Sequence, residues 1–295
     1  STHCISSAAS DVYKRQNLVK LRDLGYFTIG PSDGSQACGD EGPGRMTEPN
    51  EIIDHIDRHC STEIPQNLEG VNVMVTAGPT RERLDPVRYI TNDSSGKQGQ
   101  AIANAAKSKG AAVTLIAGPN VEPTNPGIFR IDVESAIEMN NAVQERLKET
   151  DLFIGVAAVA DYRPANLLKE KIKRHGNNSL TNLELTENPD VIANVAKVKN
   201  KPIIVGFAAE TNDPLKHARE KRIRKGIDAI IVNDVSDPSI GFNSTENAAT
   251  LIHEGGEIAF AKQSKISLGA ELIDQLENIF SLSKRQKSLR QTSHA

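Results

Sequence analysis

The chain has 295 residues, of which 25% are charged and 38% hydrophobic, with a formal net charge of −3 at pH 7. This ordinary composition does not favour bulk attraction to nucleic acid or to an anionic membrane, and no apolar run approaches the ~20 residues that span a bilayer. Cys4, Cys38 and Cys60 are too widely spaced for a disulfide framework, and no signal peptide pattern is visible, so we expect a cytoplasmic protein.

The first 70 residues carry few patterns that predict regular structure. Residues 1–16 show no convincing period, and we expect a disordered leader or foreign sequence joined to a truncated reading frame. His55 and His59 stand four residues apart beside Cys60, a spacing that can bind zinc on a helix; because no third ligand is evident, a polar helix face is favoured. The stretch "CSTEIPQNLEG" is polar and ends in glycine, so we place a linker at 65–70.

Beyond residue 70, apolar β-branched runs alternate with helical patterns. We predict strands at 71–78, 112–118, 128–133, 151–160, 202–209 and 228–234. We predict helices at 98–109, 134–148, 213–225 and 265–281, and one more that is capped by Asn188 and has Pro189 at its first position. Hairpins are expected to turn at Gly176-Asn177-Asn178 and at Gly255-Gly256. The expected fold class is therefore α/β, a Rossmann-like doubly wound mainly parallel sheet with a C-terminal antiparallel hairpin extension.

The segment 76–99 lies where such folds bind ligands, beyond the carboxyl end of a strand. It is much longer than the ~2–6 residues usual between a strand and a helix. It reaches Ser94, Ser95 and Gly96 at a helix start, where free backbone N–H groups favour an anion. An ordinary Ser or Asp helix cap is the alternative, but a cap leaves the length of the loop unexplained. The P-loop pattern does not fit, because Thr91 and Gln98 occupy two of its defining positions.

Two basic stretches follow. Asp161 stands at a strand end, shortly before Lys171 and Lys173, which would share one face of a strand and could cover a polyphosphate. Lysines that guard an edge strand are an equally good interpretation. Lys221 and Lys225 are four residues apart on the basic helix and project together, either as a solvated face or as a phosphate contact. A nucleic-acid patch is disfavoured, because no aromatic residues are interleaved.

These stretches together resemble phosphopantothenoylcysteine synthetase, an enzyme family of coenzyme A biosynthesis, over about 70–285. The matching motifs are "VTAGPTRERLDPVRYITNDSSGKQG", "AAVADYRPA", "EKIKR", "ENPDVIA", "VGFAAET", "KRIRKGIDAIIVNDVS" and "GFNSTENAATLI". Residues 31–49 are similar to the closing segment of the flavin-dependent decarboxylase that many bacteria fuse ahead of the synthetase. The resemblance thus implies a decarboxylase remnant at 17–64, a ligase domain at 71–285 and a disordered tail at 286–295.

The resemblance implies CTP-dependent ligation of 4′-phosphopantothenate to cysteine through an acyl-cytidylate, with Mg²⁺, in a homodimer whose sites borrow residues from the partner. It implies Asn92 and Lys171 as catalytic residues. Phosphopantothenate would contact Asn92, Ser94, Ser95 and Gly96. CTP would contact Gly155, Val156, Ala157, Asp161, Lys171, Asn188, Pro189, Asp190, Val191, Phe207, Lys221 and Lys225. Cys38 would be the decarboxylase proton donor only in a longer parent that holds FMN, so neither flavin nor decarboxylation is expected here.

Two other functions are carried as alternatives. A non-catalytic regulator would keep the fold and bind a nucleotide without turnover. An NAD(P)-dependent reductase would need G-x-G-x-x-G after the first strand and an acidic residue at the end of the second. The sequence has "GPTRER" after the first strand and Gly118-Pro119-Asn120 after the second, so hydride transfer is disfavoured.

Overall fold

The computed structural model describes residues 16–21, 28–30, 32–35, 41–53, 66–171, 183–234 and 244–282. The chain divides into two units, Ser1–Ile64 and Pro65–Ala295. In the first unit, β1 (Ser32–Ser35) pairs antiparallel with β2 (Glu41–Arg45), and short helices span 16–21 and 49–53. In the described part of the chain, no helix combines the length and the apolar character needed to cross a membrane.

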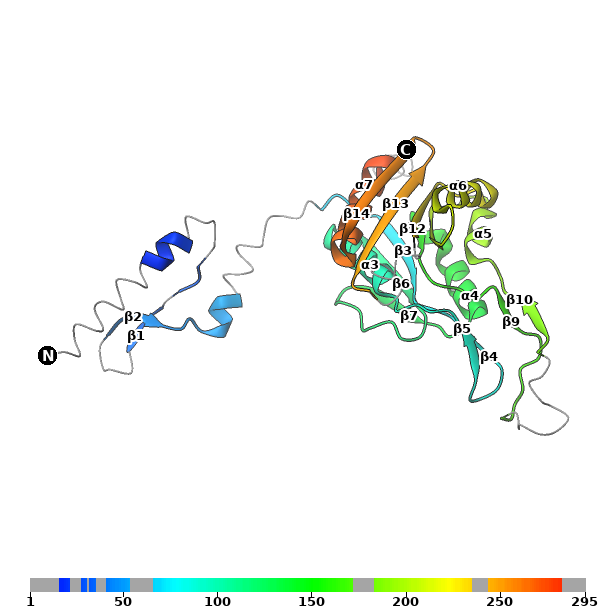
Figure 1. Cartoon of the computed structure of the whole chain (residues 1–295), viewed down its shortest axis with the longest axis horizontal. Helices are drawn as coiled ribbons and strands as arrows, with labels where there is room; N and C mark the ends of the chain where they lie inside the picture. Colours follow the sequence, from blue (N-terminus) through cyan, green and yellow to red (C-terminus); the bar gives the residue numbers. More distant parts are fainter. Residues whose placement is uncertain are drawn as a thin grey trace, which may run out of the picture. The chain divides into compact units, whose positions relative to one another are not determined.

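The second unit is built on one eight-stranded sheet with the order β14-β13-β12-β11-β8-β3-β6-β7 (Figure 1). Six neighbouring strands are parallel, and the last two join antiparallel at one edge. The strands are β3 (Asn72–Ala77), β6 (Ala112–Ala117), β7 (Phe129–Asp132), β8 (Leu152–Gly155), β11 (Ile203–Glu210), β12 (Ala229–Asp234), β13 (Glu246–His253) and β14 (Gly256–Ser264). The predicted mainly parallel sheet with a C-terminal hairpin is confirmed.

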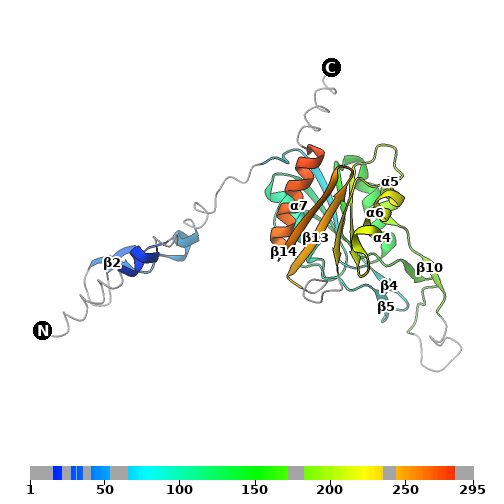
Figure 2. The same ribbon diagram turned by 45° about the horizontal axis from the view of Figure 1, so that its top comes forward.

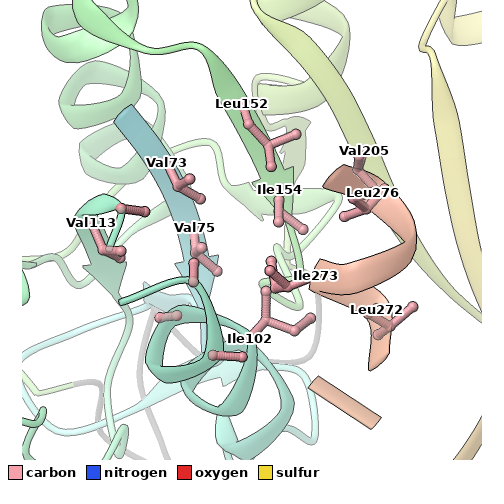
Figure 3. Packing of buried hydrophobic residues seen from close by; sticks show 14 of the residues in the cluster. Val73, Val75, Ile102, Val113, Leu152, Ile154, Val205, Leu272, Ile273 and Leu276 are labelled. Atoms are coloured by element: carbon pink, nitrogen blue, oxygen red, sulfur yellow. The ribbon is translucent and has the colours of Figure 1, made fainter. Parts of the chain in front are cut away.

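Helices cover both faces of this sheet, because successive strand residues point to opposite sides. Val73 and Val75 of β3 pack with one helical layer, whereas Met74 between them packs with the other. The first layer holds α3 (Lys97–Ser108) and α7 (Lys265–Phe280), whose Ile102, Leu272 and neighbours meet the strand side chains in Figure 3. The second layer holds α4 (Ala136–Arg146) with the 3-10 turn Leu147–Glu149, α5 (Val191–Ala196) and α6 (Pro214–Lys225), as Figure 2 shows.

Helices α3 and α7 run parallel to each other in close contact. At one end the Gln98 side-chain amide donates to the Lys265 carbonyl oxygen over 3.4 Å, and at the other the Lys109 ammonium pairs with Asp274. Between these contacts Gly269 lies so close to α3 that an added Cβ would stand 2.9 Å from the carbonyl carbon of Ala101. Both N-termini therefore lie at the same end of the sheet, beyond the carboxyl ends of the parallel strands.

The structure corrects one predicted loop and the length of one predicted strand. The segment 76–99 is not one irregular loop, because β4 (Arg81–Arg83) and β5 (Tyr89–Thr91) form a hairpin inside it. Its turn is held by Asp85, whose carboxylate accepts from the N–H groups of Val87 and Arg88 at 2.8 Å each, as Asp does in turns. The buried strand expected over 151–160 ends at Gly155.

A further correction concerns the predicted cap of the fifth helix. Helix α5 begins at Val191, and its cap is Asp190, whose carboxylate accepts the Ala193 N–H at 3.0 Å. Asn188 does not cap it, because its amide donates to the Ala160 carbonyl at 2.9 Å. The antiparallel partner of β9 (Tyr162–Pro164) is β10 (Leu185–Glu187). The expected turn at 176–178 lies outside the described residues.

Candidate functional site

A cavity of about 520 Å³ lies beyond the carboxyl ends of β3, β8, β11 and β12. Residues from eight separate stretches of the chain line it, so only the tertiary fold creates it. They are Gly78, Asn92, Asp93, Ser94, Ser95, Gly96, Lys97, Gln98, Gly99, Val156, Ala157, Ala158, Val159, Asp161, Phe207, Ala208, Ala209, Lys221, Asn233, Asn247 and Lys265.

The N-terminus of α3 opens into this cavity without a side-chain cap. Gly96 is its N-cap with φ 71°, and no side chain accepts a cap hydrogen bond there. Ser94 instead accepts the Gly96 N–H over 3.4 Å. A side chain at Gly96 would be strained by the positive φ and would place Cβ 2.6 Å from Val121. The Ser or Asp cap interpretation is therefore wrong, and the first-turn N–H groups can serve an anion.

Asn92 lines the cavity and connects two of its walls. Its side-chain amide donates to the carbonyl oxygens of Ala158 and Val159, over 3.4 and 3.2 Å. Both contacts belong to the segment that follows β8, so Asn92 holds the loop before α3 against that segment. Ser94, Ser95 and Gly96 line the same cavity as Asn92.

Two buried threonines fix the backbone of the segment after β8. Thr76 accepts the Ala157 N–H at 3.3 Å, and Thr80 accepts the Ala160 N–H at 3.0 Å. Val156 and Ala157 line the cavity, whereas Gly155 is buried outside it against Ile192. The predicted 155–157 stretch thus supplies a cavity wall through only two of its three residues.

Lys221 is the lysine of α6 that reaches the cavity, where it lies near two carboxylates. Its ammonium is 4.0 Å from a Glu210 oxygen, and Asp161 attracts it electrostatically. Burial lowers the pKa of Lys221, and repulsion from Lys225 adds to that lowering. A cation held at this wall can bind an anionic group of a ligand.

Lys225 does not line the cavity and is paired with Asp190. Its ammonium lies 2.8 Å from one Asp190 oxygen and donates to the other at 2.9 Å. Burial alone would raise the pKa of Asp190, but the hydrogen bonds from Lys225 and from the Ala193 N–H outweigh it, so the pKa is lowered. These residues line a separate surface depression with Lys197 and Arg224.

The structure does not bring every predicted residue together. Phe207 and Asp161 join Asn92, Val156, Ala157 and Lys221 on the cavity, but Lys171 is exposed and absent from its lining. Nor does the lining include Asn188, Pro189 or Val191, although the Asn188 N–H donates to the carbonyl of Asp161 at 2.8 Å. The predictions for Cys38, Lys173, His55, His59 and Cys60 fall outside the described residues.

Four polar residues on the cavity were not predicted. Asn233 donates to Asn247 over 3.3 Å, Asn247 donates to Gln98 over 3.2 Å, and Gln98 donates to the Lys265 carbonyl. All four are buried. Asn233 could have been found, because it stands at the end of a predicted strand, but nothing in the sequence marks Lys265. Among the described residues, no group of three or more His, Cys, Asp or Glu could hold a metal ion.

A doubly wound sheet with a helix N-terminus and lysines around a cavity at its carboxyl edge is typical of α/β domains that bind phosphorylated ligands. Residues 68–280 match the family described as DNA/pantothenate metabolism flavoprotein C-terminal domain, and the chain belongs to that family. The resemblance that the motifs indicated is thereby confirmed.

Relatives support the same assignment. The chain is 47% identical over 264 residues to the coenzyme A biosynthesis bifunctional protein CoaBC of Vibrio cholerae, covering 89% of this chain and 65% of that protein. It is 49% identical over 266 residues to CoaBC of Escherichia coli K12, covering 89% and 64%. The crystal structure of a CoaBC C-terminal domain has a TM-score of 0.63 at 33% identity, covering 73% of this chain and 98% of that one. The chain thus spans slightly less than two thirds of the curated relatives' length.

Proposed function

We propose that the second unit ligates 4′-phosphopantothenate to cysteine at the expense of CTP, as part of coenzyme A biosynthesis. Membership of the family and the similarity to CoaBC proteins of coenzyme A biosynthesis support the pathway. The observation that carries the proposal is the cavity itself, which has an uncapped helix N-terminus at one side and Lys221 with Asp161 at another. This arrangement offers separate anion-binding groups for an acid that bears a phosphate and for a nucleotide.

The proposed chemistry has two steps. A carboxylate oxygen of the acid attacks the α-phosphorus of CTP, the bond from that phosphorus to the bridging oxygen breaks, and pyrophosphate leaves. The cysteine amine then attacks the acyl carbon, CMP leaves with the electron pair of the acyl–oxygen bond, and the nitrogen loses a proton. Activation as a mixed anhydride solves the problem that a free carboxylate is a poor electrophile.

Side chains and backbone of this cavity have distinct parts in that proposal. Lys221 offsets negative charge on the nucleotide phosphates, which fixed cations do efficiently in a site that excludes water. The backbone at 156–157, which Thr76 holds in place, and Phe207 shape the nucleotide side. The loop from Asn92 to Gly96 receives the acid. Asn92 stays proposed as the donor to the acyl oxygen during the second step.

Mg²⁺ fits the residues present. Asp93 and Asp161 line the cavity, and this ion is commonly held by one or two carboxylates together with substrate phosphates rather than by a cage of protein ligands. These two residues would hold it, and it would neutralise phosphate charge. FMN and decarboxylation by Cys38 belong to the proposed longer parent.

The dimer is proposed on a surface outside the sheet. The hairpins β4–β5 and β9–β10 project together from one end of the unit in Figure 1, and a hydrogen bond from the Leu168 N–H to the Leu84 carbonyl at 3.1 Å joins them. Both hairpins expose large apolar side chains, namely Val87, Tyr89, Tyr162 and Leu185, and so does the segment after β9, where Leu167 is 66% exposed. An apolar surface of this kind suits a second copy. Lys171 lies on this projection, where it can serve the partner's cavity.

The test measures the two steps separately. Purified protein with CTP, Mg²⁺ and phosphopantothenate should release pyrophosphate, and CMP release should require cysteine. Thermal stabilisation by CTP without any turnover would support the regulator instead, and stabilisation by NAD(P)H alone would support the reductase. The compartment proposed for the reaction is the cytoplasm.

A further inference from the structure

The part of the cavity where α3 and α7 begin has a concentration of positive charge. Because the two helices run parallel, the positive ends of both helix dipoles lie there together. Lys97 is the first residue of α3 and Lys265 the first of α7, and both line the cavity. Neither helix has an acidic residue in its first turn to offset this charge.

Lys265 is an unusual residue to find buried. Only 7% of it is exposed, although lysines are rarely buried without a specific role. Burial lowers its pKa, and repulsion from Lys97 lowers it further. Its backbone is fixed on both sides, since its N–H donates to Thr245 at 2.9 Å and its carbonyl accepts from Gln98. The fold thus holds one lysine close to another at a site lined by backbone N–H groups.

A buried amide beside these lysines also points to a ligand. Asn233 is 6% exposed and lines the same cavity, and within the part of the chain that the structure describes its carbonyl oxygen has no hydrogen-bond partner. Its amide nitrogen is held by Asn247, which Gln98 holds in turn. A buried acceptor without a partner is costly, so a ligand hydroxyl or amide N–H is a suitable donor for it.

We propose that Lys265, together with Lys97 and the first-turn amides of α3, binds the phosphate of the acid substrate and so selects the phosphorylated acid over the free one. The proposal rests on the proposed function and extends it to a residue of the C-terminal helix. A phosphate monoester carries about −1.5 to −2 charges at neutral pH, which two lysines and a helix N-terminus can compensate. The nucleotide then occupies the side of the cavity near Lys221 and Asp161.

The experiment compares Lys265→Met with Lys262→Met in the full chain. Lys262 lies three residues earlier on β14, outside the cavity, in an exposed ion pair of 3.5 Å with Glu246. Affinity is measured by calorimetric titration with phosphopantothenate and with unphosphorylated pantothenate, and KM is measured for each substrate of the ligation. Lys265→Met should weaken phosphopantothenate binding and raise its KM about 10- to 100-fold, as expected for a lost charge-assisted hydrogen bond.

Lys265→Met should leave KM for CTP within about twofold and bind pantothenate as the unsubstituted protein does. A second variant, Lys265→Arg, keeps the positive charge and should bind phosphopantothenate more tightly than Lys265→Met. Lys262→Met should behave as the unsubstituted protein. A rise in KM for CTP alone would show that the lysines hold the nucleotide and would overturn the proposal, and so would equal losses with both acids. If Lys265→Met fails to fold, Lys97→Met at an exposed position takes its place with the same expectations. Absence of ligation in the unsubstituted protein would refute the proposed function, whereas normal ligation with unchanged acid affinity in the variant would refute only this inference.

Discussion

Gly269 of α7 lies directly against Ala101 of α3, and a Cβ at Gly269 would stand 2.9 Å from the Ala101 carbonyl carbon and 3.0 Å from its oxygen. Backbone atoms cannot give way as the end of a side chain can, so any larger residue separates the two helices. The close approach is what brings the N-termini of α3 and α7, with Lys97 and Lys265, to one cavity. Small residues at this contact therefore link the packing of the core to the proposed binding site.

Gly269→Val should destabilise the protein by about 1–3 kcal/mol, because overpacking outweighs the better helix propensity of valine. Urea unfolding followed by circular dichroism measures the change. Ile266→Ala is the matched control on the same helix, since Ile266 is 78% exposed. It should change the free energy of unfolding by at most about 0.5 kcal/mol. Equal stability of Gly269→Val and the unsubstituted protein would mean that the helices separate without cost.

Lys265 should make the stability of the ligand-free protein depend on pH. Burial and Lys97 lower the folded-state pKa of Lys265 below the 10.5 of an ordinary lysine, so the unfolded chain holds this proton more tightly than the folded one. The free-energy cost of burying the charged ammonium of Lys265 is fully present at neutral pH. It is relieved as pH rises through the folded pKa toward 10.5, so the free energy of unfolding rises in that window.

Lys265→Met should abolish this part of the pH dependence, and at neutral pH it should be at least as stable as the unsubstituted protein. Urea unfolding of both proteins at neutral pH and at several higher pH values measures the difference between them. That difference should change in favour of the unsubstituted protein as pH rises. A variant that is less stable at neutral pH, with no dependence of the difference on pH, would contradict the expected electrostatic penalty.

The sheet could be predicted from the sequence because each central strand is a run of β-branched residues apolar on both faces, such as "VNVMVTAG" and "AVTLIAG". The β4–β5 hairpin could not, since its strands have three residues each, too few to show a period. The choice between Asn188 and Asp190 as the helix cap also could not be made locally. Both residue types cap helices well, and it is the distant Ala160 carbonyl that engages Asn188.

Part of the cavity lining could be predicted from the sequence. Asp161 stands just past a predicted strand end, where such folds bind ligands, whereas Asn92 and Phe207 were indicated by the resemblance to the synthetase family; all three line the cavity. Lys265 has no such signal. Its burial arises from the parallel packing of α7 on α3, a contact between segments far apart in the sequence. From the sequence alone, a lysine at the first position of a helix is expected to be exposed to solvent.

Lys171→Gln should reduce pyrophosphate release by at least ~10²–10³-fold while the protein stays folded, if this lysine contacts the transferred phosphate from a partner subunit. Its exposed position predicts that the substitution leaves the melting temperature unchanged. Lys169→Gln is the matched control, because Lys169 is an exposed lysine on the same projection. Pyrophosphate release in the absence of cysteine, measured with saturating CTP, is the readout. Near-normal release by Lys171→Gln would mean that this lysine only protects an exposed edge, which is worth little.

Asn92→Asp should separate the two half-reactions. An ionised carboxylate cannot donate a hydrogen bond to the acyl oxygen on which charge develops as cysteine attacks, and it repels that charge. Removing one such donor typically costs ~10²–10³ in rate. Because Lys221 and the nucleotide side are unchanged, pyrophosphate should still be released about once per site. Acyl-cytidylate should then accumulate, and mass spectrometry of the quenched reaction with CTP and phosphopantothenate detects it.

The contacts of Asn92 call for a second variant at the same position. In the structure its amide donates to the carbonyl oxygens of Ala158 and Val159, so a carboxylate would also face two carbonyl oxygens and could displace the loop. Asn92→Ala removes the donor without adding that repulsion, and it should accumulate the same intermediate. If both variants lose pyrophosphate release and product formation in parallel, Asn92 acts by holding the loop before α3 in place rather than by stabilising the acyl oxygen. Accumulation in both variants would instead assign the amide to the second step, because a merely misplaced loop slows binding and activation as well.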